Sequence, residues 1–336
     1  MSNNTAPEVH TVPTSPYADL LIRILKREEQ GYPIELTLDG RLEFRRGYVK
    51  PTVAQWKPAA PGADAGRSLF ELLLGDDPVA NAWAMLRGTA PQRRIRLSID
   101  DDAAELHPIP WELLYEPGEG DAGVNLAAAD ATPFSRYIPD PQDDPPPAAA
   151  HRLKILVAIA DPANLESWGL PNINVKEEWE ALQESLAGLP VDLRLLPQPC
   201  TLEAIEAALL EGAHVLHIIA HGVWSKSKQE AAIVLANRNN QLHFVYADEH
   251  AQALARHLRD GGAPAGGPAF PQETTGAAGE KAPTLRLVFL ASCQTATQNP
   301  TDAFAAFAPR LVRAGAPAVL AMQDLAPVES TRAFAV

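Results

Sequence analysis

The chain has 336 residues, 46% of them hydrophobic and 21% charged, a composition typical of a globular protein with a sizeable core. Its 28 Lys+Arg against 42 Asp+Glu give a net charge of -14, which disfavours direct binding to nucleic acid or to an anionic membrane. The first residues lack the pattern of a secretion signal, and no apolar run approaches the ~18 residues that span a bilayer. We therefore expect a cytoplasmic protein, in which the two cysteines, Cys200 and Cys293, remain free thiols.

The first part of the chain carries short, mixed signals. Residues 1–18 are polar, and we expect them to be disordered. Asp39-Gly40 between two short apolar segments predicts a hairpin. The other signals are an alternating segment at 94–99, helical patterns near 68–74 and 79–86, and a segment at 19–27 that fits either a helix or a strand. Residues 19–140 are thus predicted to form a small α+β region with antiparallel strands, which packs on the sheet that follows.

A proline-rich stretch at 140–147 predicts a boundary, and residues 150–336 then alternate regularly between strands and helices. Strands are predicted at 153–160, 191–196, 214–220, 285–291 and 318–322, and helices at 175–186, 202–210, 248–258 and 303–312. This order predicts a doubly wound, mostly parallel α/β sheet, whose sites lie beyond the carboxyl ends of the strands. We expect residues 261–280, rich in glycine and proline, to form a mobile loop, and the last residues to be a truncated helix.

A histidine and a cysteine each follow an apolar strand of this sheet. His221 follows the strand that ends at Ala220, and Cys293 follows the strand that ends at Ala291. A thiol attacks a peptide carbonyl as the thiolate or beside a base, and one histidine can both activate the thiol and protonate the leaving amine. The N–H groups of Gly222 and Cys293 are candidate oxyanion donors. The pair therefore predicts a cysteine peptidase with His221 as general acid and base and Cys293 as nucleophile, both expected at a loop-lined rim.

Several motifs together resemble a known family. They are His221-Gly222, the segment 290–295 around Cys293, the segment Gly315 to Met322, and Ile109-Pro110-Trp111-Glu112-Leu113-Leu114-Tyr115 upstream. Over roughly residues 90–336 the chain resembles the CHAT peptidases, which are similar to caspases and separases. The resemblance implies a caspase-like sheet, the same roles for His221, Cys293 and Gly222, a protein substrate, a place in bacterial signalling or defence, and a regulatory or sensor protein as partner. It implies no cofactor and no metal.

Other patterns have simpler interpretations. His217 and His221 would lie about 13 Å apart on a strand, too far to share a zinc ion. Gly118 to Gly123 spells a dinucleotide-binding pattern without a following helix, and we interpret it as a turn. Ser292 lacks the surroundings of a serine nucleophile and is interpreted as a neighbour of the thiol. Cys200 is expected to be structural, as is Trp111, with Glu112 paired at its rim.

Primary specificity is expected from the strand ends that flank the dyad, which in the related fold line the pocket. Those positions hold Asp161, Gln323 and Asp324, and carboxylates favour a substrate cation, which predicts cleavage after Arg or Lys. A simple turn at Asp161-Pro162 is the competing interpretation. For the whole protein, a catalytically silent binding or signalling scaffold is the alternative to the peptidase. A nucleotide-binding sensor is a third class, but the chain lacks a phosphate-binding loop.

Overall fold

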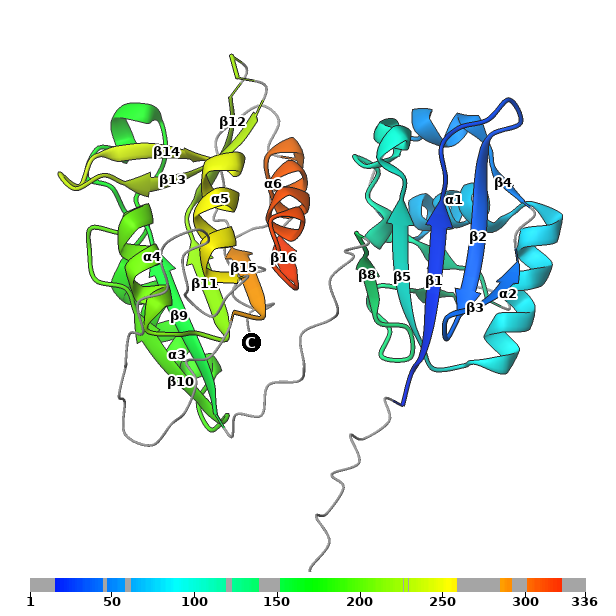
Figure 1. Ribbon diagram of the computed structural model, residues 1–336, viewed down its shortest axis with the longest axis horizontal. Helices are drawn as coiled ribbons and strands as arrows, with labels where there is room; N and C mark the ends of the chain where they lie inside the picture. The colour runs from blue at the N-terminus through cyan, green and yellow to red at the C-terminus, as the bar shows by residue number, and fades with distance from the viewer. Residues whose placement is uncertain are drawn as a thin grey trace, which may run out of the picture. The chain divides into compact units, whose positions relative to one another are not determined.

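In the computed structural model, the described residues are 16–44, 47–57, 62–118, 123–138, 152–225, 227–228, 230–258, 285–291 and 301–321. The chain divides into two compact units, Met1–Pro139 and Asp140–Val336 (Figure 1). Within the described residues, no helix combines the length and the apolar character needed to cross a bilayer.

The first unit is built on a sheet whose described strands follow the order β3-β2-β1-β5-β8, with β4 paired to β2. The strands are β1 (Ala18–Ile24), β2 (Tyr32–Leu38), β3 (Arg41–Phe44), β4 (Tyr48–Val49), β5 (Arg93–Ile99) and β8 (Phe134–Arg136). The predicted hairpin is confirmed: Asp39 and Gly40 join β2 to β3 with φ of 49° and 74°, the left-handed conformation that a tight two-residue turn requires. The ambiguous segment 19–27 is the central strand β1.

The expectation of antiparallel strands in this unit is only partly correct. β1 pairs antiparallel with β2, but β5 runs parallel to both β1 and β8. The reason is the connection, because α1 (Ala63–Leu74) and α2 (Asp77–Thr89) precede β5 and supply the long crossover that parallel pairing needs.

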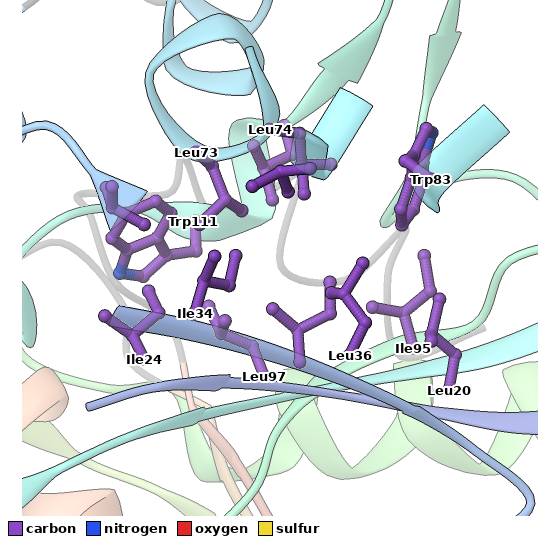
Figure 2. Close-up of a cluster of buried hydrophobic side chains, with 14 of the residues drawn as sticks. Leu20, Ile24, Ile34, Leu36, Leu73, Leu74, Trp83, Ile95, Leu97 and Trp111 are labelled. Carbon is purple, nitrogen blue, oxygen red and sulfur yellow. The ribbon is translucent and has the colours of Figure 1, made fainter. Parts of the chain in front are cut away.

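The core of the first unit lies on one face of this sheet (Figure 2). Leu20, Ile34 and Ile95 point from neighbouring strands toward the helices, while the other face carries polar side chains such as Arg23 and Glu35. Three 3-10 helices complete the unit: η1 (Pro51–Gln55), η2 (Asp101–Leu106) and η3 (Trp111–Leu113).

Trp111 and Glu112 have the structural roles that the sequence predicts. Trp111 is fully buried, and its indole N–H donates to the Leu106 carbonyl at 3.0 Å, while Glu112 pairs with Arg136 at 2.8 Å. Residues 119–122 of the glycine-rich segment lie outside the described residues. On either side of them β6 (Tyr115–Glu116) and β7 (Val124–Asn125) pair antiparallel, and no helix begins in residues 126–138, so the described surroundings lack the helix that a dinucleotide-binding pattern requires.

The second unit contains a parallel sheet with described strand order β10-β9-β11-β15-β16. The strands are β9 (Leu153–Ile159), β10 (Val191–Leu195), β11 (Val215–Ile219), β15 (Leu287–Ala291) and β16 (Val319–Ala321). The helices are η4 (Leu165–Trp168), α3 (Val175–Ser185), α4 (Leu202–Leu210), α5 (Ala247–Leu258) and α6 (Thr301–Arg313). The predicted alternation of strands and helices is confirmed, and the protein is a mixed α/β protein.

Both faces of this sheet carry buried apolar side chains, as near-continuous apolar strands require. Val157, Ile219 and Phe289 pack on the face with α3. Alternate residues of the same strands, such as Leu156, Ile218 and Leu290, pack on the opposite face with α4, α5 and α6. The strands therefore have apolar residues at successive positions because helices lie on both sides.

A second sheet in this unit did not follow from the sequence. It consists of β12 (His221–Ser225), β13 (Glu230–Ala236) and β14 (Leu242–Tyr246), paired antiparallel in chain order. β12 begins directly after the end of β11, so that this small sheet extends from the carboxyl edge of the parallel one (Figure 1).

Candidate active site

The strand order of the parallel sheet reverses between β9 and β11. From β9 the chain goes to β10 on one side, then crosses back to β11 on the other side. In an open α/β sheet such a reversal opens a crevice beyond the carboxyl ends of the two strands, where ligands bind. Asp161 follows β9 and His221 follows β11, which makes this edge the candidate site.

His221 is held by the segment that follows β9. Its Nε2 lies 2.7 Å from the Pro171 carbonyl oxygen, and the residue is 1% exposed. We expected His221 at a loop-lined rim rather than in the core. His221 does follow β11 at the carboxyl edge, where the segment between β9 and α3 supplies the Pro171 carbonyl, but its side chain is buried there.

The Pro171 contact determines the chemistry of the imidazole. A carbonyl oxygen only accepts hydrogen bonds, so Nε2 of His221 carries the proton that it donates. In the neutral ring the basic nitrogen is then Nδ1, the atom that can take a proton from another group. A backbone acceptor that fixes both the tautomer and the ring orientation is what a general acid and base requires.

Asp161 lies half-buried at the same edge, and its carboxylate contacts the backbone. Its Oδ1 accepts a hydrogen bond from the Ile173 N–H at 3.0 Å. Because Ile173 lies two residues beyond Pro171, this bond links the two ends of the segment that contains the Pro171 carbonyl. Asp161 was selected from the sequence as a pocket residue, but its bond to Ile173 and the role of the Pro171 carbonyl were not predicted, since backbone groups have no residue signature.

Of the other predicted site residues, Gly222 is described and the rest are not. Gly222 is buried in β12 opposite Ile233 of β13. Cys293, its neighbour Ser292, Gln323 and Asp324 lie outside the described residues, as do the loop 261–280 and residues 1–15.

Three further histidines of this unit lie near the sheet but have structural surroundings. His217 of β11 stacks on Phe289 of β15 with ring centroids 4.5 Å apart, and burial lowers its pKa to about 4. His250 of α5 is fully buried against Phe307 of α6, and burial lowers its pKa to about 4. His214 accepts a hydrogen bond at Nδ1 from the Lys154 N–H. Among the described residues, no group of three potential ligands could hold a metal ion.

Cys200 has the structural role that the sequence predicts. It is fully buried in the core beside Ile205 and Leu209, and burial raises the pKa of its thiol to about 12. A thiol with such a pKa is neutral and unreactive at physiological pH.

These features define a class: an α/β protein with a histidine fixed at the carboxyl edge of a parallel sheet. The family model of the CHAT domain matches residues 63–336, which is most of the chain, and the chain belongs to the CHAT domain family, a family of caspase-like proteases. The match begins at the start of α1, so it includes much of the first unit as well as the parallel sheet. A search of curated proteins gave no match.

Proposed function

We propose that this protein is a cysteine endopeptidase with a caspase-like sheet, in which His221 is the general acid and base and Cys293 the nucleophile. The observation that carries the proposal is the contact of His221 Nε2 with the Pro171 carbonyl, 2.7 Å long, which prepares Nδ1 to exchange a proton. Any buried imidazole N–H needs an acceptor, so what favours a catalytic role is the position of this bonded pair at the carboxyl edge of the parallel sheet.

The register of the strands supports the choice of Cys293. Ile159, Ile219 and Ala291 are paired across β9, β11 and β15. Asp161, His221 and Cys293 each follow one of these residues by two positions in the sequence. Neighbouring strands lie about 4.8 Å apart, so equal offsets favour a meeting of the thiol with the imidazole.

The proposed reaction is acyl transfer in two steps. The thiolate of Cys293 forms a bond to the substrate carbonyl carbon, the C–N bond breaks, and the imidazolium gives its proton to the leaving amine. A water molecule then attacks the thioester, His221 takes its proton, and the thiol leaves as the carboxylic acid forms. The N–H groups of Gly222 and Cys293 are the proposed donors to the negative oxygen of each tetrahedral intermediate.

The proposed substrate is a protein cleaved after Arg or Lys. Asp161 and Asp324 are acidic positions at the ends of strands that flank the dyad, and Gln323 is adjacent in sequence. A carboxylate in a partly dry pocket pairs with a basic side chain more favourably than with an acidic or apolar one. We further propose that the protein acts in the cytoplasm, in signalling or defence, under the control of a regulatory or sensor protein.

The test is digestion of a peptide library derived from a proteome by the wild type and by Cys293→Ala. We expect cuts after Arg and Lys with the wild type and none with the variant. Iodoacetamide should label Cys293 faster than the buried Cys200, and a chelator should leave the rate unchanged. Cleavage that persists in Cys293→Ala would contradict the peptidase mechanism, and an inactive wild type that binds a partner would support the scaffold instead.

A further inference from the structure

We infer that residues 161–174, called here the brace segment, hold the general base in place, and that Asp161 and Asn164 are positioning residues for His221. The inference deepens the proposed function and rests on it for the catalytic role of His221. The placement of the His221 imidazole is independent of that role, because it depends only on contacts within the second unit.

The atom that touches His221 lies between two buried anchors. The Pro171 carbonyl accepts from Nε2 of His221, and Leu170 and Ile173 on either side of Pro171 are 5% and 4% exposed. Leu170 packs with Leu165, while Ile173 packs on the α3 face of the parallel sheet. The carbonyl is therefore restrained from both directions along the chain.

Asp161 closes the brace segment at its base. Its carboxylate accepts from the Ile173 N–H at 3.0 Å and thus joins the end of β9 to the residue just before α3. An ionised acceptor makes a stronger bond to an N–H group than a neutral one does. This bond uses one oxygen, Oδ1, and leaves the charge of the carboxylate at the site.

Asn164 ties the middle of the brace segment to the small sheet. Its Oδ1 accepts from the Leu242 N–H at 2.6 Å, and the neighbouring Ala163 N–H donates to the Asn240 carbonyl at 2.9 Å. Leu165 is fully buried and packs with Val234 of β13. The segment is thus fixed to the hairpin of β13 and β14 by polar and apolar contacts together.

The same hairpin also holds His221. β12 begins at His221, which pairs with Val234 across β12 and β13. The imidazole and the carbonyl that orients it are therefore both held by the hairpin of β13 and β14. His221 is held through the pairing of β12 with β13, and the segment that carries the carbonyl is held through the Asn164 bond to Leu242 of β14. A loop that only covered the edge would not need both ties, whereas misplacement of a catalytic group by about 1 Å can cost about 100-fold in rate.

The experiment compares Asp161→Ala and Asn164→Ala with Asp161→Asn and Asn164→Asp, which keep an oxygen acceptor at each position. For the alanine variants we expect kcat to fall by about 10- to 100-fold. KM should change little in Asn164→Ala, whereas in Asp161→Ala it should rise for Arg and Lys substrates as in Asp161→Asn, because both variants lose the carboxylate charge. We expect Asn164→Asp to restore most of kcat. For Asp161→Asn we expect kcat to be retained and KM for Arg and Lys substrates to rise, since only the charge is lost. Lys176→Ala, an exposed change at the start of α3, is the control that should behave as the wild type.

A second measurement does not depend on turnover. In ¹⁵N-histidine NMR of the full chain, assigned with His221→Gln, the wild type should show the Nε2–H tautomer of His221. The alanine variants should show a mixture of tautomers, and the acceptor-keeping variants should not. Thermal melting identifies any variant that fails to fold. If the variants at Asp161 or at Asn164 do not fold, the variants at the other of these two positions decide the result.

The two hypotheses fail in different ways. Alanine variants with the kcat and the tautomer of the wild type would overturn the inference while leaving the peptidase intact. An inactive wild type whose His221 tautomer still depends on Asn164 would overturn the peptidase and leave the brace segment as described. A loss of kcat in Asp161→Asn as large as that in Asp161→Ala would show that charge, and not the bond to Ile173, is what matters, and would overturn the role of Asp161.

Discussion

The two units use their buried polar side chains in opposite ways. In the first unit, Arg93 is 2% exposed and lies 3.5 Å from Glu116, which also accepts from the Trp83 indole N–H at 2.9 Å. Arg136, which is partly exposed, also donates to the carbonyls of His107 and Ile109 and to Glu112. These groups are charged, and their bonds join segments of the fold to one another.

In the second unit the buried polar side chains include two histidines that burial keeps neutral, His217 and His250. His217 Nε2 and both ring nitrogens of His250 are buried without a hydrogen-bond partner within the part of the chain that the structure describes. Burial lowers the pKa of both side chains, because a charged imidazole would lose its hydration. The difference is that the first unit pairs its buried charges, whereas in the second unit burial keeps the imidazoles of His217 and His250 uncharged.

The largest effect is expected from His221→Gln. Glutamine can still donate an N–H to the Pro171 carbonyl but offers no basic nitrogen, so peptide cleavage should fall by about 100- to 10,000-fold. The free energy of unfolding should change little. A combined His221→Gln, Cys293→Ala variant should be scarcely worse than either single change, because the proposed mechanism uses the two groups as one unit. Activity measured with the library peptides and thermal melting together check this, and an active His221→Gln would remove the imidazole from the mechanism.

The next effect concerns the paired charges of the first unit. Glu116→Ala removes the carboxylate that faces Arg93 and Trp83, and breaking a buried pair by removing one partner costs about 3–5 kcal/mol. We expect urea unfolding to shift accordingly and hydrogen exchange to rise in β5 and α2. If the loss were below about 1 kcal/mol, the view that the first unit depends on its buried ion pair would be wrong.

A smaller effect follows from the neutral histidines. The pKa of His250 is about 4 in the folded protein against an ordinary value of 6.5, so the unfolded chain binds more protons between these values. The contribution to stability is complete above about pH 6.5 and is lost as the pH falls toward 4, with a slope of up to ~1.4 kcal/mol per pH unit for each such group. His250→Leu should make the pH dependence of urea unfolding less steep.

Phe307, whose ring contacts the ring of His250, provides a matched control for this prediction. Phe307→Leu removes apolar area against His250 without removing a titratable group. It should lower the free energy of unfolding at every pH and leave the slope unchanged. The same slope in His250→Leu as in the wild type would mean that this histidine does not contribute to acid sensitivity.

The smallest effect is expected at an exposed pair of the first unit. Arg23 and Glu35 lie 3.2 Å apart on the polar face of the sheet, with side-chain exposures of 45% and 18%. Such pairs contribute about 0.2–1 kcal/mol, so Arg23→Ala should shift urea unfolding far less than Glu116→Ala does. Comparable losses of unfolding free energy in the two variants would indicate that burial does not explain why one ion pair stabilises the fold more than the other.

The sequence by itself determined the features that depend on local pattern. The Asp39-Gly40 turn, the α/β alternation of the second unit and the ends of β11 and β15 follow from periodicity, because neighbouring residues decide which face of a strand or helix is buried. These features were enough to select His221 and Cys293 as candidates and to suggest the family.

The strand pairing and the hydrogen-bond partners of main-chain groups depend on the tertiary structure and did not follow from the sequence. β1 was ambiguous because a strand is identified by what it pairs with. β13 was missed because Ala231 to Ala236 are buried at every position, and periodicity alone does not assign such a short apolar run to a strand or a helix. The Asn164 to Leu242 bond joins residues that are 78 positions apart, and the acceptor for His221 is a main-chain carbonyl 50 positions away. A backbone atom looks the same at every residue of the sequence, so only the folded chain could show that Pro171 orients the imidazole.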